Sequence, residues 1–255
     1  MSNISNIPVS KWPILKSPPV ILAIFQLKFG STNNENLTNL IANDKAIKLK
    51  FPNRNENYHY NIGFQGTPAP GISLNAKADT KIKSYIYFTP DQKKKFIVEN
   101  GSITFVDENP YQGWDKFKQE VIECLNLLSE QLKGTFLNRT SIRFVNKFSF
   151  ESFSDSLEYF TKTISTESEV KFPLLKSTFR LEVQIPKTDI RAIINHALEP
   201  TGLNHLDYFL DIDTLDHKQF KFDLNLISIQ MEQIRTVKND IFFDTVKQKT
   251  IDLCN

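Results

Sequence analysis

The sequence predicts an α+β fold made of two pseudo-duplicated antiparallel sheet units, which together form a curved sheet with two long helices on one face. Short β-rich segments bounded by Gly, Pro and Asn make up much of the chain. Two long segments, 114–132 and 223–253, instead carry apolar residues at helical spacing. Both halves follow the same order, which is strand, short helix, several antiparallel strands and long helix.

This order predicts a frayed N-terminal tail at residues 1–10, a first α+β half at 11–134 and a second α+β half at 135–255. We expect the two halves to pack as one globular unit, because a chain of 255 residues can bury a sizeable core.

The first half begins with "VILAIFQLKF" at 20–29, a Pro-bounded run of β-formers that predicts a strand. A helix is expected next, around Leu37, Leu40 and Ile41, behind Asn and Ser capping candidates. Short strands are then expected at 48–51, 58–64, 72–77, 84–89, 96–98 and 103–106. The Asn-Gly pair of "ENGS" at 99–102 tolerates positive φ and predicts a hairpin turn.

The clearest predicted helix spans 114–132 and ends before Gly134. Its apolar face consists of Trp114, Phe117, Val121, Cys124, Leu125, Leu128 and Leu132. Cys124 lies on this face, so we interpret it as a small buried hydrophobe and not as a nucleophile.

The second half begins with "FLNRTSIRFVNKF" at 136–148, an alternating run that predicts a strand. A short helix is expected at 154–164, followed by strands at 177–186, 190–198 and 206–215. The final helical segment carries Leu224, Ile227, Met231 and Ile234 on one face.

The charge, the cysteine count and the apolar runs of the sequence argue against several classes of protein. Lys and Arg number 31 against 29 Asp and Glu, a net charge of +2, which is weak for a dedicated nucleic-acid binder. The run Lys93 to Lys95 is flanked by Asp91 and Glu99, which favours a solvated turn. The two cysteines, Cys124 and Cys254, lie far apart in the sequence and lack the paired spacing of a disulfide framework or a structural zinc site. No long apolar run or signal-type N-terminus is present, so we expect a cytoplasmic protein with no membrane association and no cofactor.

The first candidate site is Arg139, Arg143 and Asn146, interpreted as ligand- or partner-binding residues. On a strand, both arginines and the intervening Ser141 point to one face, whereas Asn146 points to the other. Guanidinium groups bind carboxylates and other anions bidentately, which suggests an anion clamp. The alternative is an internal ion pair with an acid on a neighbouring strand, such as Glu182.

Asp211 and Asp213 form the second, weaker candidate. They point to one face if the strand persists, and paired carboxylates can hold a divalent metal. His205 and His217 lie nearby in sequence and could supplement them. The alternative is that Asp211 pairs with an arginine across the sheet.

Three functions follow from these candidates. The leading hypothesis is a non-catalytic protein that holds a partner protein or a small anionic ligand on the curved sheet; whether it forms homo-oligomers is left open. The first alternative is a nucleic-acid-binding saddle, based on Arg139, Arg143 and Lys147 together with the lysine run. The second is a metal-dependent hydrolase or transferase that uses Asp211, Asp213 and a histidine. Motifs for nucleotide loops, serine elbows and paired zinc ligands are absent from the sequence.

Several segments together resemble a sporadically distributed prokaryotic family of conserved hypothetical proteins of about this length. They are "LKSPPVILAIFQLKF", "NPYQGWDKFKQEVIECL", "FLNRTSIRFVNKF" and "YFLDID". The most specific is similar to the family's run Arg, x, Gly, Leu, Arg, Tyr, Ile, Asn. Arg139, Arg143 and Asn146 match it directly, whereas Ser141, Ile142, Phe144 and Val145 replace its Gly, Leu, Tyr and Ile. The resemblance implies the architecture and, through the sporadic distribution, a mobile or defence-associated locus; it implies no activity.

Overall fold

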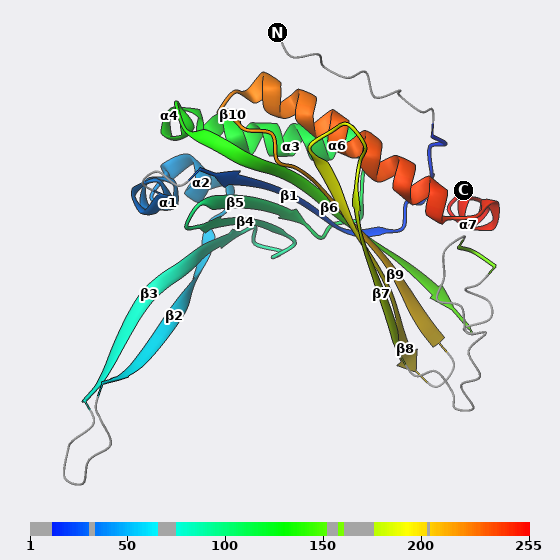
Figure 1. The fold of residues 1–255 in the computed structure, drawn as a ribbon, viewed down its shortest axis with the longest axis horizontal. Helices are drawn as coiled ribbons and strands as arrows, with labels where there is room; N and C mark the ends of the chain where they lie inside the picture. Colours follow the sequence, from blue (N-terminus) through cyan, green and yellow to red (C-terminus); the bar gives the residue numbers. More distant parts are fainter. Residues whose placement is uncertain (1–11, 31–33, 66–74, 152–157, 161–175, 203–204) are drawn as a thin grey trace.

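The computed structural model describes residues 12–30, 34–65, 75–151, 158–160, 176–202 and 205–255 (Figure 1). The first half contains β1 (Val20–Phe29), α1 (Asn34–Ala42), α2 (Lys45–Lys50), β2 (Asn53–Gln65), β3 (Asn75–Phe88), β4 (Lys94–Glu99), β5 (Ser102–Asp107), α3 (Trp114–Leu127) and α4 (Ser129–Leu132). The second contains β6 (Phe136–Phe150), β7 (Ser177–Gln184), β8 (Ile190–Gly202), β9 (His205–Asp216), β10 (Phe220–Lys221), α6 (Leu224–Thr245) and α7 (Gln248–Leu253).

The strands form one ten-stranded antiparallel sheet in the order β2-β3-β4-β5-β1-β6-β9-β8-β7, with β10 paired to β6. The sheet is curved: the β2–β3 hairpin and the β7–β9 strands extend as two arms away from the helices (Figure 1). We call the side between the arms the concave face. The predicted α+β class and curved sheet are confirmed.

Helices α3 and α6 lie together on the other side of the sheet, as predicted (Figure 1). All seven residues of the predicted apolar face of 114–132 are buried, although the helix breaks at Leu128 into α3 and α4. Asp223 caps α6 by accepting hydrogen bonds from the backbone N–H groups of Asn225 and Leu226. Ile227, Met231 and Ile234 then pack in the same apolar cluster as α3 and the central strands, which makes this cluster the main core.

A second apolar cluster lies beneath the end of α6 and α7 and includes Phe148, Tyr208 and Phe242. The segment before β1 reaches the same end of the molecule. The backbone N–H of Ser17 donates to the carbonyl of Cys254, and Trp12 Nε1 donates to Asp240 Oδ1 at 3.0 Å. The beginning of the described chain is therefore attached to the C-terminal helices.

The structure differs from the predicted local structure in one segment and describes two others only in part. The strand expected at 48–51 is wrong: α2 occupies this region because Asp44 accepts hydrogen bonds from the N–H groups of Ala46 and Ile47 and so begins a helix. The strands expected at 72–77 and 84–89 are parts of one strand, β3, while 72–74 lie outside the described residues. The helix expected at 154–164 also lies mostly outside them; Phe160 forms a β-bridge with Val246.

Candidate binding site on the concave face of the sheet

The concave face carries both apolar and charged side chains in a row that crosses the sheet. Residues paired directly across neighbouring strands point to the same face. One such row runs through Lys95, Val106, Ile24, Arg143, Asp213 and Ile193. Helices α3 and α6 lie on the opposite side of the sheet and do not cover this mixed surface (Figure 1).

Arg143 lies at the centre of this face and pairs with Asp211 of the neighbouring strand β9. Its Nε is 2.8 Å from Asp211 Oδ1 and its second terminal nitrogen is 2.7 Å from Oδ2, a bidentate ion pair. The hydrogen bond to Asp211 raises the pKa of Arg143 further above its usual value. Asn195 Nδ2 donates to the same carboxylate at 3.1 Å. The alternative of an internal ion pair thus describes Arg143, with Asp211 as the partner in place of Glu182.

Arg139 lies on the same face and is less completely paired. It donates to Gln26 Oε1, and Gln26 Nε2 donates in turn to Thr104 Oγ1 at 2.9 Å. Arg139 Nε and Asp213 Oδ1 are both buried and have no hydrogen-bond partner within the described part of the chain. Burial raises the pKa of Asp213, against the attraction of Arg139, and burial likewise lowers the pKa of Arg139. The centre of the face therefore keeps one donor and one acceptor that remain unsatisfied.

Asn146, the third predicted residue, points to the helix-covered face, as its position in the alternation requires. It is only 3% exposed, and its Nδ2 donates to the carbonyl oxygen of Leu210 at 3.0 Å. The structure therefore brings Arg139 and Arg143 together and separates both from Asn146.

Asp211 and Asp213 point to one face of β9, as predicted, but neither predicted histidine joins them. His205 lies six residues before Asp211 on the same strand, which is roughly 20 Å at the usual rise of a β-strand. His217 is exposed just beyond the end of β9. Both oxygens of Asp211 already accept hydrogen bonds. Within the described ranges, no group of three His, Cys, Asp or Glu side chains is placed to hold a metal ion.

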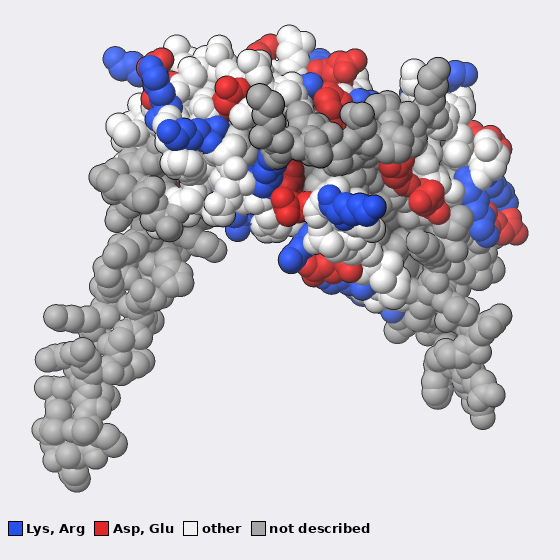
Figure 2. All heavy atoms as spheres, turned by 45° about the horizontal axis from the view of Figure 1, so that its top comes forward, with Lys and Arg blue, Asp and Glu red and all other residues white. Residues whose placement is uncertain are grey.

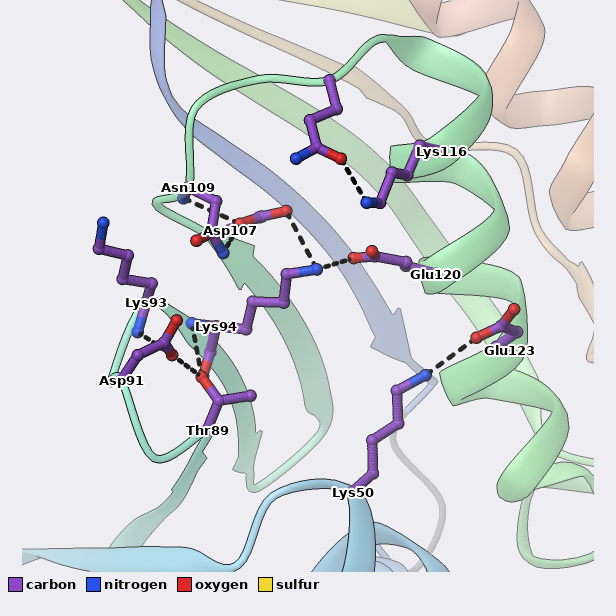
Figure 3. A network of polar contacts seen from close by, with 11 residues as sticks. Lys50, Thr89, Asp91, Lys93, Lys94, Asp107, Asn109, Lys116, Glu120 and Glu123 are labelled. Atoms are coloured by element: carbon purple, nitrogen blue, oxygen red, sulfur yellow. Dashed lines mark hydrogen bonds and ion pairs between the residues drawn. The ribbon is translucent and has the colours of Figure 1, made fainter.

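The lysine run also forms local ion pairs (Figure 3). Lys94 Nζ lies between Glu120 of α3 and Asp107 of β5, 2.5 Å and 3.7 Å from their carboxylate oxygens. Lys95 pairs with Glu108. Because these charges are neutralised locally, the run does not form a continuous basic surface.

Sequence reasoning missed Gln26 and Asn195, which hold Arg139 and Asp211, because both are ordinary strand residues brought close only by sheet pairing. It also missed Lys238. This residue has a sequence signal: it follows Met231 and Ile234 at helical spacing and is therefore a charge within an apolar stripe.

Comparisons of the chain with protein-family models, curated protein sequences and solved structures find no match. The resemblance of the Arg139 to Phe148 segment stays a prediction. The case for a site therefore depends on the geometry described above.

Proposed function

We propose that this protein is a non-catalytic binding protein that holds a partner protein on the concave face of its sheet. The observation that carries the proposal is a sheet whose described helices α3 and α6 cover one face, while the other face displays partly exposed apolar residues among charged ones. The partly exposed apolar residues of this surface include Leu22, Ile24, Val145, Phe209 and Ile193. A mixture of this kind, with apolar anchors and polar groups, is typical of protein interfaces.

Arg139 Nε and Asp213 Oδ1 are buried and do not reach a partner, so the proposal depends on the exposed side chains of this face. A small anion is a weaker candidate, because the carboxylate of Asp211 already fills the fork of Arg143.

Nucleic acid is also a weaker candidate than protein. On the concave face, Arg143 pairs with Asp211 and Lys147 pairs with Asp207, each at 2.7 Å. Figure 2 looks obliquely onto the helices, and there the positive and negative side chains of the described residues are interspersed. A phosphate backbone requires unpaired positive charge, which neither surface concentrates.

We also propose that the two halves arose by duplication. The strand order supports this: β1 pairs with β5, the last strand before α3, while β6 pairs with β9, the last long strand before the final helices. The first strands of the two halves, β1 and β6, pair antiparallel at the centre, which is consistent with a pseudo-twofold axis between them.

The experiment compares two substitutions of an apolar residue by lysine. Val145→Lys changes the concave face, whereas Leu49→Lys changes α2, where Leu49 is 84% exposed and lies outside that face. Tagged full-length protein is used to capture partners from an extract of its native host, and the melting temperature of each variant confirms folding.

We expect the wild type and Leu49→Lys to capture the same partner and Val145→Lys to lose it at least about tenfold, because a charge is inserted among the apolar contacts. Equal capture by Val145→Lys, or loss with Leu49→Lys, would overturn the proposal. So would a low-salt gel shift with DNA or RNA that weakens steeply as salt is added, since this result identifies a nucleic-acid binder.

A further inference from the structure

A cavity of about 200 Å³ lies on the helix-covered side, opposite the proposed partner surface. Four parts of the chain form its wall: the segment 12–20 before β1, the segment 111–114 at the start of α3, Phe144 and Asn146 of β6, and the second half of α6. The wall is largely aromatic and apolar. Pockets of this character, with a few polar groups, are typical of sites for small molecules.

Lys238 of α6 is the distinctive polar residue of this wall. Its Nζ lies 4.3 Å from the centre of the Phe144 ring, and it forms no ion pair or hydrogen bond with any residue that the structure describes. Lys238 is partly buried, and a cation–π contact replaces only part of the hydration free energy that its ammonium loses there. Burial, assisted by the charge of Arg235, lowers the pKa of Lys238 to about 7.

The acids near Lys238 on α6 form hydrogen bonds with other side chains. Asp240 accepts from Trp12 Nε1, and Glu232 accepts from Trp114 Nε1 at 2.8 Å and from Lys118 Nζ at 2.7 Å. Arg235 also pairs with Glu232 and lies over the Trp114 ring. Two cations, Arg235 and Lys238, line this side of the cavity, and of the two only Arg235 forms an ion pair with a described carboxylate.

We propose that this cavity binds a small organic anion, with its carboxylate on the ammonium group of Lys238 and its apolar body against the surrounding aromatic rings. The cavity volume suits a molecule smaller than a typical drug. Trp114 and Phe242 supply flat apolar walls, which favours an aromatic body. Trp12, held by Asp240, lies at the same cavity.

The titratable groups that line the cavity are few, which makes the pH dependence simple. The titratable residues of the wall are Lys238, Tyr111 and Arg235. The segment 12–20 and β6 contribute no titratable side chain to it. Burial raises the pKa of Tyr111, so its hydroxyl stays neutral. Carboxylate binding should therefore follow the protonation of Lys238 and weaken as pH rises from about 7 to 9.

The test uses three carboxylate probes, benzoate, indole-3-acetate and octanoate, each titrated into ¹⁵N-labelled full-length protein to about 10 mM. The uncharged amide of each probe is the matched ligand control. Lys238→Met removes the ammonium at similar length, and Lys48→Met removes an exposed lysine of α2 as the matched variant control.

We expect at least one carboxylate to bind saturably, with chemical shifts concentrated around α6 and β6. The amide should bind the wild type about tenfold or more weakly than the acid does, and the acid should bind Lys238→Met about tenfold or more weakly than the wild type. The affinity of the acid for Lys48→Met should equal that for the wild type. Melting temperatures establish that each variant is folded. The proposal is overturned if no probe binds saturably, if the amides bind as well as the acids, or if Lys238→Met binds like the wild type.

Discussion

At the scale of single residues, Arg143 and Phe144 are neighbours on β6 that point to opposite faces, and this makes their substitution a sharp comparison. Phe144 is 1% exposed and packs against the rings of Tyr111 and Phe117. Phe144→Ala should lower the free energy of unfolding by about 3–5 kcal/mol through the cavity that it leaves. Arg143→Ala should cost only about 1 kcal/mol, because that side chain is 45% exposed and its ion pair is partly solvated.

Urea unfolding of both variants provides the measurement. If Arg143→Ala proves as destabilising as Phe144→Ala, then Arg143 acts as a buried structural charge and is the wrong residue for a partner contact. That Arg143 and Phe144 point to opposite faces of β6 could be predicted from sequence, since successive side chains of a strand alternate between its two faces. The partner of Arg143 could not, because the register that brings Asp211 beside it is set by pairing between distant segments.

Asp213 is a second residue whose substitution tests stability, because its carboxylate is partly buried on the sheet. Burial raises its pKa, so the folded protein binds this proton more tightly than the unfolded chain does. Stability contributed by the protonated form is therefore lost as pH rises above about 4, and at neutral pH the ionised carboxylate destabilises the fold. Asp213→Asn should raise the free energy of unfolding by about 1 kcal/mol at pH 7, roughly 2–4 °C in Tm.

Thermal unfolding at pH 7 and near pH 4 measures this effect. The difference in Tm between Asp213→Asn and the wild type should be smaller at the lower pH. A variant that is less stable than the wild type at pH 7 would show that the attraction between Arg139 and Asp213 outweighs the cost of burial.

At the scale of elements, α2 shows how one capping residue decides the local structure. The segment 48–51 contains Leu49 and Phe51 between lysines, an alternation that favours a strand. Asp44 overrides it by accepting two backbone hydrogen bonds at the start of the helix, and its other oxygen accepts from Gln131 Nε2 at 2.7 Å. The strand prediction did not take this cap into account, and the contact with α4 depends on tertiary packing that a local pattern does not encode.

Asp44→Ala should therefore cost about 1–2 kcal/mol, the usual effect of losing an N-cap together with a side-chain hydrogen bond. Amide hydrogen exchange should show faster exchange confined to α2, with the central strands unchanged. Asp91→Ala serves as the control, because Asp91 accepts similar bonds in an exposed turn that begins no helix. Unchanged exchange in α2 would mean that packing of Ile47 in the core, and not the cap, holds this helix.

At the scale of the whole molecule, contacts across the boundary between the two halves hold the fold together. The sequence predicted the division after residue 134, but the strand order depends on long-range pairing that local patterns do not encode. β1 and β6 pair along nearly their full length in the middle of the sheet. Above them, Trp114 and Lys118 of α3 both bind Glu232 of α6. The main apolar cluster contains residues of both halves.

Neither half, 11–134 or 135–255, should therefore fold alone. Each would expose one edge of a central strand and the apolar faces of its helix, which favours aggregation. Co-expression of the two halves should restore the folded structure, because the free edges of β1 and β6 can then pair and the shared apolar cluster can form between the halves. Dispersed NMR spectra and a cooperative melt are expected of the co-expressed pair only. A cooperative melt from either half by itself would show that it has an independent core, and that the pairing of β1 with β6 joins two domains that are each already stable.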